Sequence, residues 1–171
     1  SVEIAKIHGV KLSVRSSYET SKEGTFVVNR DQLEKEFVVT GVACDQKVAK
    51  IGIFDLEDKP GSATKVFQAL ADANVNVDMI VQSAMRNNMN DIAFTVPLDE
   101  VDNALEVLND LKNKMSMSDI VSSTNVAKVS IVGAGMVSST EKKKKMLSVL
   151  AANNINIQMI ATSEIKVSVL V

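Results

Sequence analysis

The chain has 171 residues, of which 46% are hydrophobic, 23% charged and only 4% aromatic, so it has an aliphatic core and room for one large or two small domains. A formal net charge of −2 offers no positive surface for nucleic acid, and no stretch approaches the roughly 18 apolar residues of a membrane-spanning helix. We therefore expect a cytoplasmic protein with no nucleic-acid or membrane partner.

Residues 1–36 belong to no repeated pattern in the chain. The run "VEIAKIHG" is typical of the last turns of a helix, and "GVKLSVRSSYETSKEGTFV" predicts a strand, a turn and a second strand. The helix would begin outside this chain, which suggests a polypeptide cut from something larger. The only histidine, His8, has no Cys, Asp or Glu at metal-ligand spacing, so neither a metal site nor a His-based nucleophilic triad is expected.

The run "EFVVTGVACD" that follows predicts a spare strand containing the only cysteine. Cys44 cannot form a disulfide within the chain, and its strand-like setting favours a small buried hydrophobic residue over a reactive thiol. We expect no catalytic residues here, since the chain has no glycine-rich phosphate loop with a lysine and no recognisable pair of carboxylates.

Residues 37–115 predict a first domain with the order β-α-β-β-α. The strand "VAKIGIF" is followed by a helix, "SATKVFQALADA", whose entry is marked by Pro60 and Gly61. The runs "VNVDMIVQSAM" and "IAFTVPL" predict a hairpin that ends at Pro97. Asp99 is placed to cap a second helix with an apolar stripe.

Residues 116–171 repeat this pattern as a second domain without the last helix. The phrase "ANVNVDMIVQS" returns eighty residues later as "NNINIQMIATS", between a helix "EKKKKMLSVLAAN" and a strand "EIKVSVLV". The predicted fold class is therefore α+β, with two ferredoxin-like βαββαβ units and antiparallel sheets. The spare strand before the first unit and a linker strand "SDIVSSTN" could supply the remaining edges, so an exchange of edge strands stays open.

The loop "EDKPGSA" at the start of the first helix is the best candidate site. A helix amino terminus offers free N–H groups and partial positive charge to a carboxylate, and Gly61 allows close approach. Asp58 could accept hydrogen bonds from an ammonium group, and the Gln82 amide can both donate and accept. The alternative is that Pro-Gly only makes a turn, that Asn74, Asn76, Asn154 and Asn156 only close helices, and that the lysines at 142–145 form a solvated face.

The strings "KIGIFDLEDKPGSATKVFQALADANVNVDMIVQS", "VAKVSIVGAGM" and "NINIQMIATSEIKVSVLV" together resemble the paired ACT domains of the regulatory half of aspartate kinase (aspartokinase). The resemblance implies that the full protein phosphorylates the β-carboxylate of aspartate with ATP. This chain would be its sensor, inactive alone, without a cofactor, since ATP and Mg would bind only the absent kinase domain. Residues 1–36 would then be the linker from the end of that kinase domain.

The resemblance also implies partners and site residues. The effector would be lysine, threonine or both, the ACT domains would form a homodimer, and the kinase domain or a catalytic subunit would be a further partner. The family's effector-binding positions fall here on Asp58, Gly61, Ser62, Ala63, Gln82, Asn154 and Ile155. Glu141 stands where the second domain would need an uncharged loop, so a matching second site is in question. A structural ACT dimerisation module that binds no ligand is the alternative.

Overall fold

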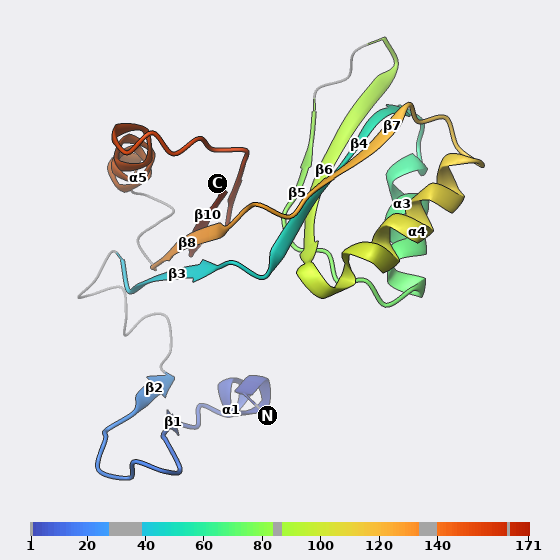
Figure 1. The fold of residues 1–171 in the computed structure, drawn as a ribbon. Helices are drawn as coiled ribbons and strands as arrows, with labels where there is room; N and C mark the ends of the chain where they lie inside the picture. Colours follow the sequence, from blue (N-terminus) through green and yellow to red (C-terminus); the bar gives the residue numbers. More distant parts are fainter. Residues whose placement is uncertain (1, 28–38, 84–86, 134–139, 164) are drawn as a thin grey trace.

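The computed structural model describes residues 2–27, 39–83, 87–133, 140–163 and 165–171. Within them the chain forms two four-stranded sheets and a separate two-stranded one, and all strand pairs are antiparallel (Figure 1). The predicted fold class is confirmed. No helix in these residues is long and apolar enough to cross a membrane.

The amino-terminal segment folds as the sequence predicts. Helix α1 (Val2–Ile7) is followed by strands β1 (Leu12–Val14) and β2 (Thr25–Val27), with Leu12 opposite Val27. Most of its residues are exposed, including Tyr18 at 96%. A two-stranded ribbon with so little buried surface is marginally stable by itself.

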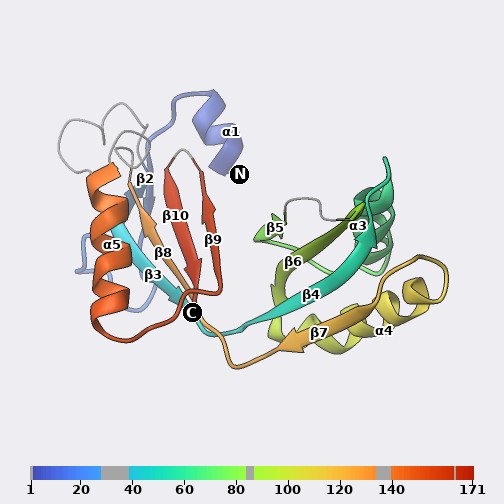
Figure 2. The same cartoon turned by 90° about the horizontal axis from the view of Figure 1, so that it is seen from above.

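The first large sheet has the strand order β5-β6-β4-β7, and its two helices cover one face (Figures 1 and 2). Its elements are β4 (Val48–Glu57), α3 (Ser62–Asp72), β5 (Ile80–Gln82), β6 (Met89–Pro97), η1 (Leu98–Glu100), α4 (Val101–Lys112) and β7 (Asp119–Ser123). Alternation along β4 turns Ile51 and Ile53 into the core, where they meet Leu70 of α3 and Leu108 of α4. The rings of Phe67 and Phe94 pack edge to face, 5.6 Å apart.

The start of α4 differs from the prediction. A short 3-10 turn precedes the helix, Glu100 stands at the N-cap, and no side chain caps the helix, so Asp99 does not have the predicted role. The Glu100 carboxylate instead accepts hydrogen bonds from the backbone N–H and the side-chain amide of Asn76, at 2.6 and 2.9 Å. These two hydrogen bonds join the turn after α3 to the start of α4. The two helices lie side by side.

The second large sheet has the order β3-β8-β10-β9, with α5 over one face (Figure 2). Its elements are β3 (Gly41–Asp45), β8 (Lys128–Val132), α5 (Thr140–Ala152), β9 (Met159–Thr162) and β10 (Lys166–Leu170). β10 is central and buries Val167, Val169 and Leu170. Ser130 and Ser168 are also buried, and their hydroxyl oxygens form a hydrogen bond of 2.7 Å that satisfies both groups.

Each of the two large sheets takes one outer strand from outside the shared β-α-β-β segment. β3 precedes the first unit in the chain but pairs with β8 of the second, Gly41 facing Val132 and Asp45 facing Lys128. β7 follows α4 and completes the first sheet beside β4. The first domain is therefore inserted between the first two strands of the second, whereas the expected ranges 37–115 and 116–171 divide the chain linearly. A sequence repeat reveals only the shared β-α-β-β segment, and edge pairing depends on backbone groups that any strand can offer.

Cys44 is a correction to the sequence analysis. It lies in β3, an edge strand with a neighbour on one side only, and it is exposed together with Gly41, Val42 and Ala43. The sequence analysis expected a buried thiol because the β-branched run around Cys44 is typical of a strand in the core. The β3 position at the sheet edge explains the exposure.

Candidate functional site

The loop between β4 and α3 ends at a glycine that forms the N-cap of α3. Gly61 stands at the N-cap of α3 with φ of 92°, a left-handed conformation that glycine adopts without steric cost. A Cβ at this position would meet nothing within 4 Å, so the backbone conformation alone requires glycine there. The prediction of a Pro-Gly helix entry is confirmed.

The amino end of α3 presents unused backbone donors. The N–H of Ser62 donates to the carbonyl of Lys59 and that of Lys65 to Gly61, both at 3.0 Å. This leaves the N–H groups of Ala63 and Thr64 without a protein acceptor in the described part of the chain. No side chain caps the helix and its first turn holds no acidic residue. These donors and the helix dipole can receive a carboxylate.

A carboxylate and a buried amide lie beside this loop. Asp58 donates its N–H to the carbonyl of Asn88 at 2.9 Å, and its Oδ1 accepts a hydrogen bond from Nδ2 of Asn90 at 2.8 Å. Asn90 is only 6% exposed, and its Oδ1 is buried with no partner among the described residues. Buried polar atoms are rarely left unpaired, so Asn90 stands out among the buried polar side chains of this domain. Carboxylate and amide oxygens are acceptors suited to an ammonium group.

Asn90 was not singled out by the sequence analysis. The run "RNNMND" reads as a polar turn, but β6 already begins at Met89, and Asn90 pairs with Leu56 of β4. The signal that could have found it is its spacing, because Asn90 stands two residues before Ile92 and so shares the face of the strand that buries Ile92 and Phe94.

Gln82 lies at the same end of the first sheet as this loop. It is the last residue of β5, exposed, and opposite Ile92 of β6, while Met89 of β6 lies opposite Glu57 just before the loop. The sheet therefore brings the first-domain candidates to one end. They are Asp58, Gly61, Ser62, Ala63 and Gln82.

Asn154 and Ile155 lie in the other domain, directly after α5. Asn154 has φ of 54° and its N–H donates to the carbonyl of Ala151, so it closes the helix in the left-handed conformation, as Asn74 does after α3. Ile155 is 42% exposed. Within the described residues no hydrogen bond or ion pair joins either residue to the α3 loop, so one chain alone does not unite all seven candidates.

The second domain's own helix entry has a different chemistry. Residues 134–139, which include most of the loop before α5, lie outside the described residues. α5 itself begins at Thr140 with Glu141 in its first turn, whereas the first turn of α3 has no acidic residue. In the described chain, no group of three or more His, Cys, Asp or Glu side chains could hold a metal ion.

Comparison with known proteins adds two family matches. Residues 51–114 match the ACT domain family, and residues 129–171 match a second family that is also described as an ACT domain. The first match covers most of β4 and then α3, β5, β6 and α4, and the second covers most of β8 and then α5, β9 and β10.

The similar curated proteins and the similar solved structures are aspartate kinases or their subunits. The chain is 40% identical to an aspartokinase of Bacillus sp. strain MGA3 over 170 residues, which cover 99% of this chain and 41% of that protein. It is similar to the ligand-free regulatory subunit of aspartate kinase from Thermus thermophilus, with 42% identity, a TM-score of 0.74, and coverage of 78% of this chain and 88% of that one. A structure of aspartokinase alpha and beta subunits has a chain with 45% identity, a TM-score of 0.71 and coverage of 77% and 86%. The chain thus spans about two fifths of the length of the curated relatives it matches.

Proposed function

This chain belongs to the aspartate kinase family and corresponds to its regulatory region with two ACT domains, and we propose that it binds a free amino acid as a feedback effector. In this proposal the effector is lysine, threonine or both. The full protein transfers phosphate from ATP to aspartate in the cytoplasm, and this region inhibits that reaction when the effector is bound.

The observation that supports the proposal is that hydrogen-bond donors for an anion and a carboxylate for a cation lie at the same end of the first sheet. Unused N–H groups at the start of α3 suit a carboxylate, and the exposed Asp58 carboxylate, whose Oδ1 accepts a hydrogen bond from Nδ2 of Asn90, suits an ammonium group. A free amino acid carries both charges on one carbon. Gln82 at the end of β5 could then contact its side chain.

A complete site in this proposal needs a second copy of the chain. Asn154 and Ile155 are exposed after α5, and a partner chain could bring them over the α3 loop of the first. The homodimer and the association with a kinase domain or catalytic subunit are therefore parts of the same proposal. An effector inhibits only if it favours one arrangement of the assembly, typically by about 1 to 3 kcal/mol.

Thermal-shift titration with lysine, threonine and methionine, singly and together, tests the proposal, because a ligand that binds only the folded state raises the melting temperature. We expect a rise with lysine or threonine and dissociation constants in the micromolar to millimolar range, roughly −4 to −8 kcal/mol. Asp58→Asn and Gln82→Ala should abolish the rise. Asp99→Asn is the matched control, since it removes an exposed carboxylate on η1. Unchanged affinity in both site variants would refute the site.

The alternative function is dimerisation without a ligand. It draws support from apolar side chains exposed on edge strands, with Val42 of β3 68% exposed, Ile80 of β5 49% and Ile160 of β9 46%. Sedimentation that shows a stable dimer, together with no thermal response to any of the twenty amino acids, would favour it.

A further inference from the structure

The junction between the two ACT domains follows an internal two-fold pattern. When the repeats are aligned on "VAKIGIF" and "VAKVSIV", Lys50 corresponds to Lys128. When they are aligned on "NVDMIVQS" and "NIQMIATS", Asp78 corresponds to Gln158. These are the residues whose side chains cross from one domain to the other.

The crossing contacts are reciprocal. Lys50 Nζ of the first domain donates to Oε1 of Gln158 in the second at 3.3 Å. Lys128 Nζ of the second domain donates to Oδ2 of Asp78 in the first at 2.6 Å. Each lysine therefore reaches the residue that corresponds to its counterpart's acceptor, which is the pattern of a two-fold interface between identical subunits, here within one chain.

An apolar cluster is formed by neighbours of these four residues in the chain, together with Leu170. Its buried members are Val48, Met79, Val126, Met159 and Leu170. Val48 corresponds to Val126 and Met79 to Met159, so the cluster follows the same pattern as the lysines. Burial of these side chains stabilises the junction, while the hydrophobic attraction itself has no direction.

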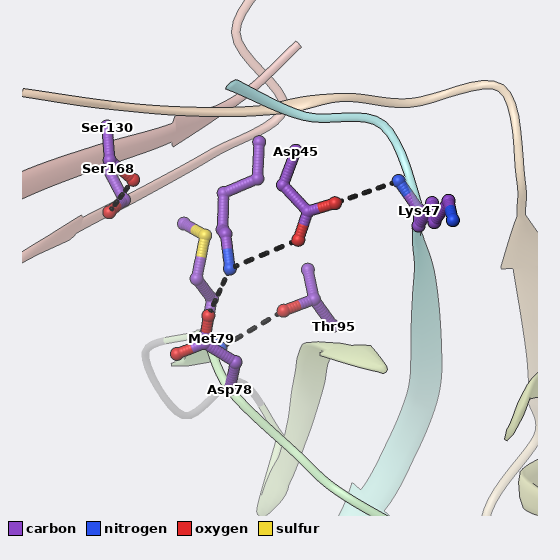
Figure 3. Close-up of polar contacts among 8 residues, drawn as sticks. Asp45, Lys47, Asp78, Met79, Thr95, Ser130 and Ser168 are labelled. Atoms are coloured by element: carbon purple, nitrogen blue, oxygen red, sulfur yellow. Dashed lines mark hydrogen bonds and ion pairs between the residues drawn. The ribbon is translucent and has the colours of Figure 1, made fainter. Parts of the chain in front are cut away.

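The two polar contacts differ in charge. Lys128 Nζ also lies 3.9 Å from Oδ2 of Asp45, which places it between carboxylates of both domains, and its side chain is 18% exposed. Figure 3 labels the residues that carry the two carboxylates, Asp45 and Asp78. Among the described residues, the side chain of Lys50 has the neutral amide of the exposed Gln158 as its acceptor. Hydrogen bonds between ionised groups are stronger and more demanding in geometry than those to a neutral amide. The hydrogen bond and charge of Lys128 lower the pKa of the Asp78 carboxyl, while burial opposes this shift and Lys166 adds to it.

The acceptor of Lys128 is itself held in place. The N–H of Met79, next to Asp78, donates to the Thr95 hydroxyl at 3.1 Å, and the N–H of Thr95 donates to the carbonyl of Met79 at 3.0 Å (Figure 3). Lys47 likewise donates its N–H to Asp45 Oδ1 at 2.9 Å. These hydrogen bonds hold the backbone next to Asp78 and the carboxylate of Asp45.

Both halves of the junction lie on the segments that carry candidate effector residues. Asp78 precedes Gln82 by four residues, and Gln158 follows Asn154 by four. A change of angle at the junction would therefore move the two candidate segments relative to each other.

We propose that Lys128 is the positioning residue that fixes the angle between the two ACT domains, through Asp78 of the first domain and Asp45 of the second, and that the Lys50 contact is dispensable for this. The inference that a change of this angle would alter effector binding rests on the function proposed above. The positioning role itself does not.

Spin-label distance measurements on the whole chain test this role. Labels at Asn109→Cys on α4 and Ser148→Cys on α5, both exposed positions, report the distance between the domains in a Cys44→Ala background. We expect Lys128→Met to broaden the distance distribution at least twofold and Lys50→Met to leave it unchanged. An unchanged distribution in Lys128→Met, or equal broadening in both variants, would overturn the proposal.

Two further measurements keep the outcome decisive. Circular dichroism shows whether each variant folds, and if Lys128→Met does not, Asp78→Asn removes the charge while keeping a side chain of the same shape. Addition of lysine or threonine should narrow the distribution of the unmodified chain. Should neither amino acid bind, the effector proposal fails while the distribution of the ligand-free variants still decides the role of Lys128.

Discussion

The two ACT domains share a repeated phrase and a strand order, yet they differ in the depth of their cores. In the first, α3 buries Val66 and Leu70, and α4 buries Val101, Ala104 and Leu108. In the second, the described helix is α5, and none of its residues is buried. The same β-α-β-β segment can therefore support either a self-sufficient core or a thinly covered sheet.

The domains also differ at the helix entry. The first has an uncapped α3 with Gly61 in the left-handed conformation, and the second has an acidic residue in the first turn of α5. The two domains therefore share the order of their strands, which goes with the repeated sequence. The residues at the helix entry decide in which domain an anionic group can bind.

The largest expected effect is on the cores. Leu70→Ala and Leu150→Ala change corresponding positions, of which the first is fully buried and the second partly exposed. Cavity formation at Leu70 should cost about 2 to 5 kcal/mol of unfolding free energy, and Leu150→Ala clearly less. Urea unfolding followed by circular dichroism measures both. Equal costs would mean that the α5 face is covered in solution.

The next effect concerns the two helix entries. Asp58→Ala should weaken binding of the effector amino acid at least tenfold, which corresponds to about 1.4 kcal/mol. Glu141→Gln at the corresponding helix of the second domain should leave that affinity unchanged. Calorimetric titration with lysine and with threonine gives the comparison, and a loss in Glu141→Gln would show that the second domain takes part in binding.

A smaller effect is expected from the left-handed conformation of Gly61. Gly61→Ala adds a methyl group in open space but forces an L-residue into φ of 92°, and should destabilise the first domain by roughly 1 to 2 kcal/mol. Gly41→Ala in β3 is the control, because its Cβ also meets nothing and its φ is not positive. Chemical unfolding should show Gly41→Ala close to the unmodified chain.

The smallest effect is the pH dependence of the junction. The pKa of Asp78 is lowered from its ordinary value of 3.8, so its contribution to stability is complete above that value and is lost as the pH falls through the lowered pKa. The side chain is 52% exposed, and solvent screening limits the contribution to less than about 1 kcal/mol. Urea midpoints of the unmodified chain and Asp78→Asn should differ at pH 7, and the difference should shrink steadily as the pH is lowered through the acid range. A difference that does not change with pH would contradict the ionic contribution.

Particular residues show which features of the structure could be predicted from the sequence. Pro60 and Gly61 marked the entry of α3, and Asn74 and Asn154 marked left-handed helix ends, because these features depend on the conformational limits of single residues. Asn90 was missed, because its burial depends on a register between β4 and β6 that no local pattern encodes.

The sequence by itself determined the repeated β-α-β-β segments, the α+β class and the resemblance to ACT domains, since these follow from local periodicity and turn residues. Only the tertiary structure decided that β3 joins the second sheet and β7 the first, that Cys44 is exposed, and that Lys128 reaches Asp78 in the other domain. The physical reason is that strand partners and cross-domain contacts join residues distant in the chain, and their energies depend on backbone pairing and shared burial that appear only when the whole chain is folded.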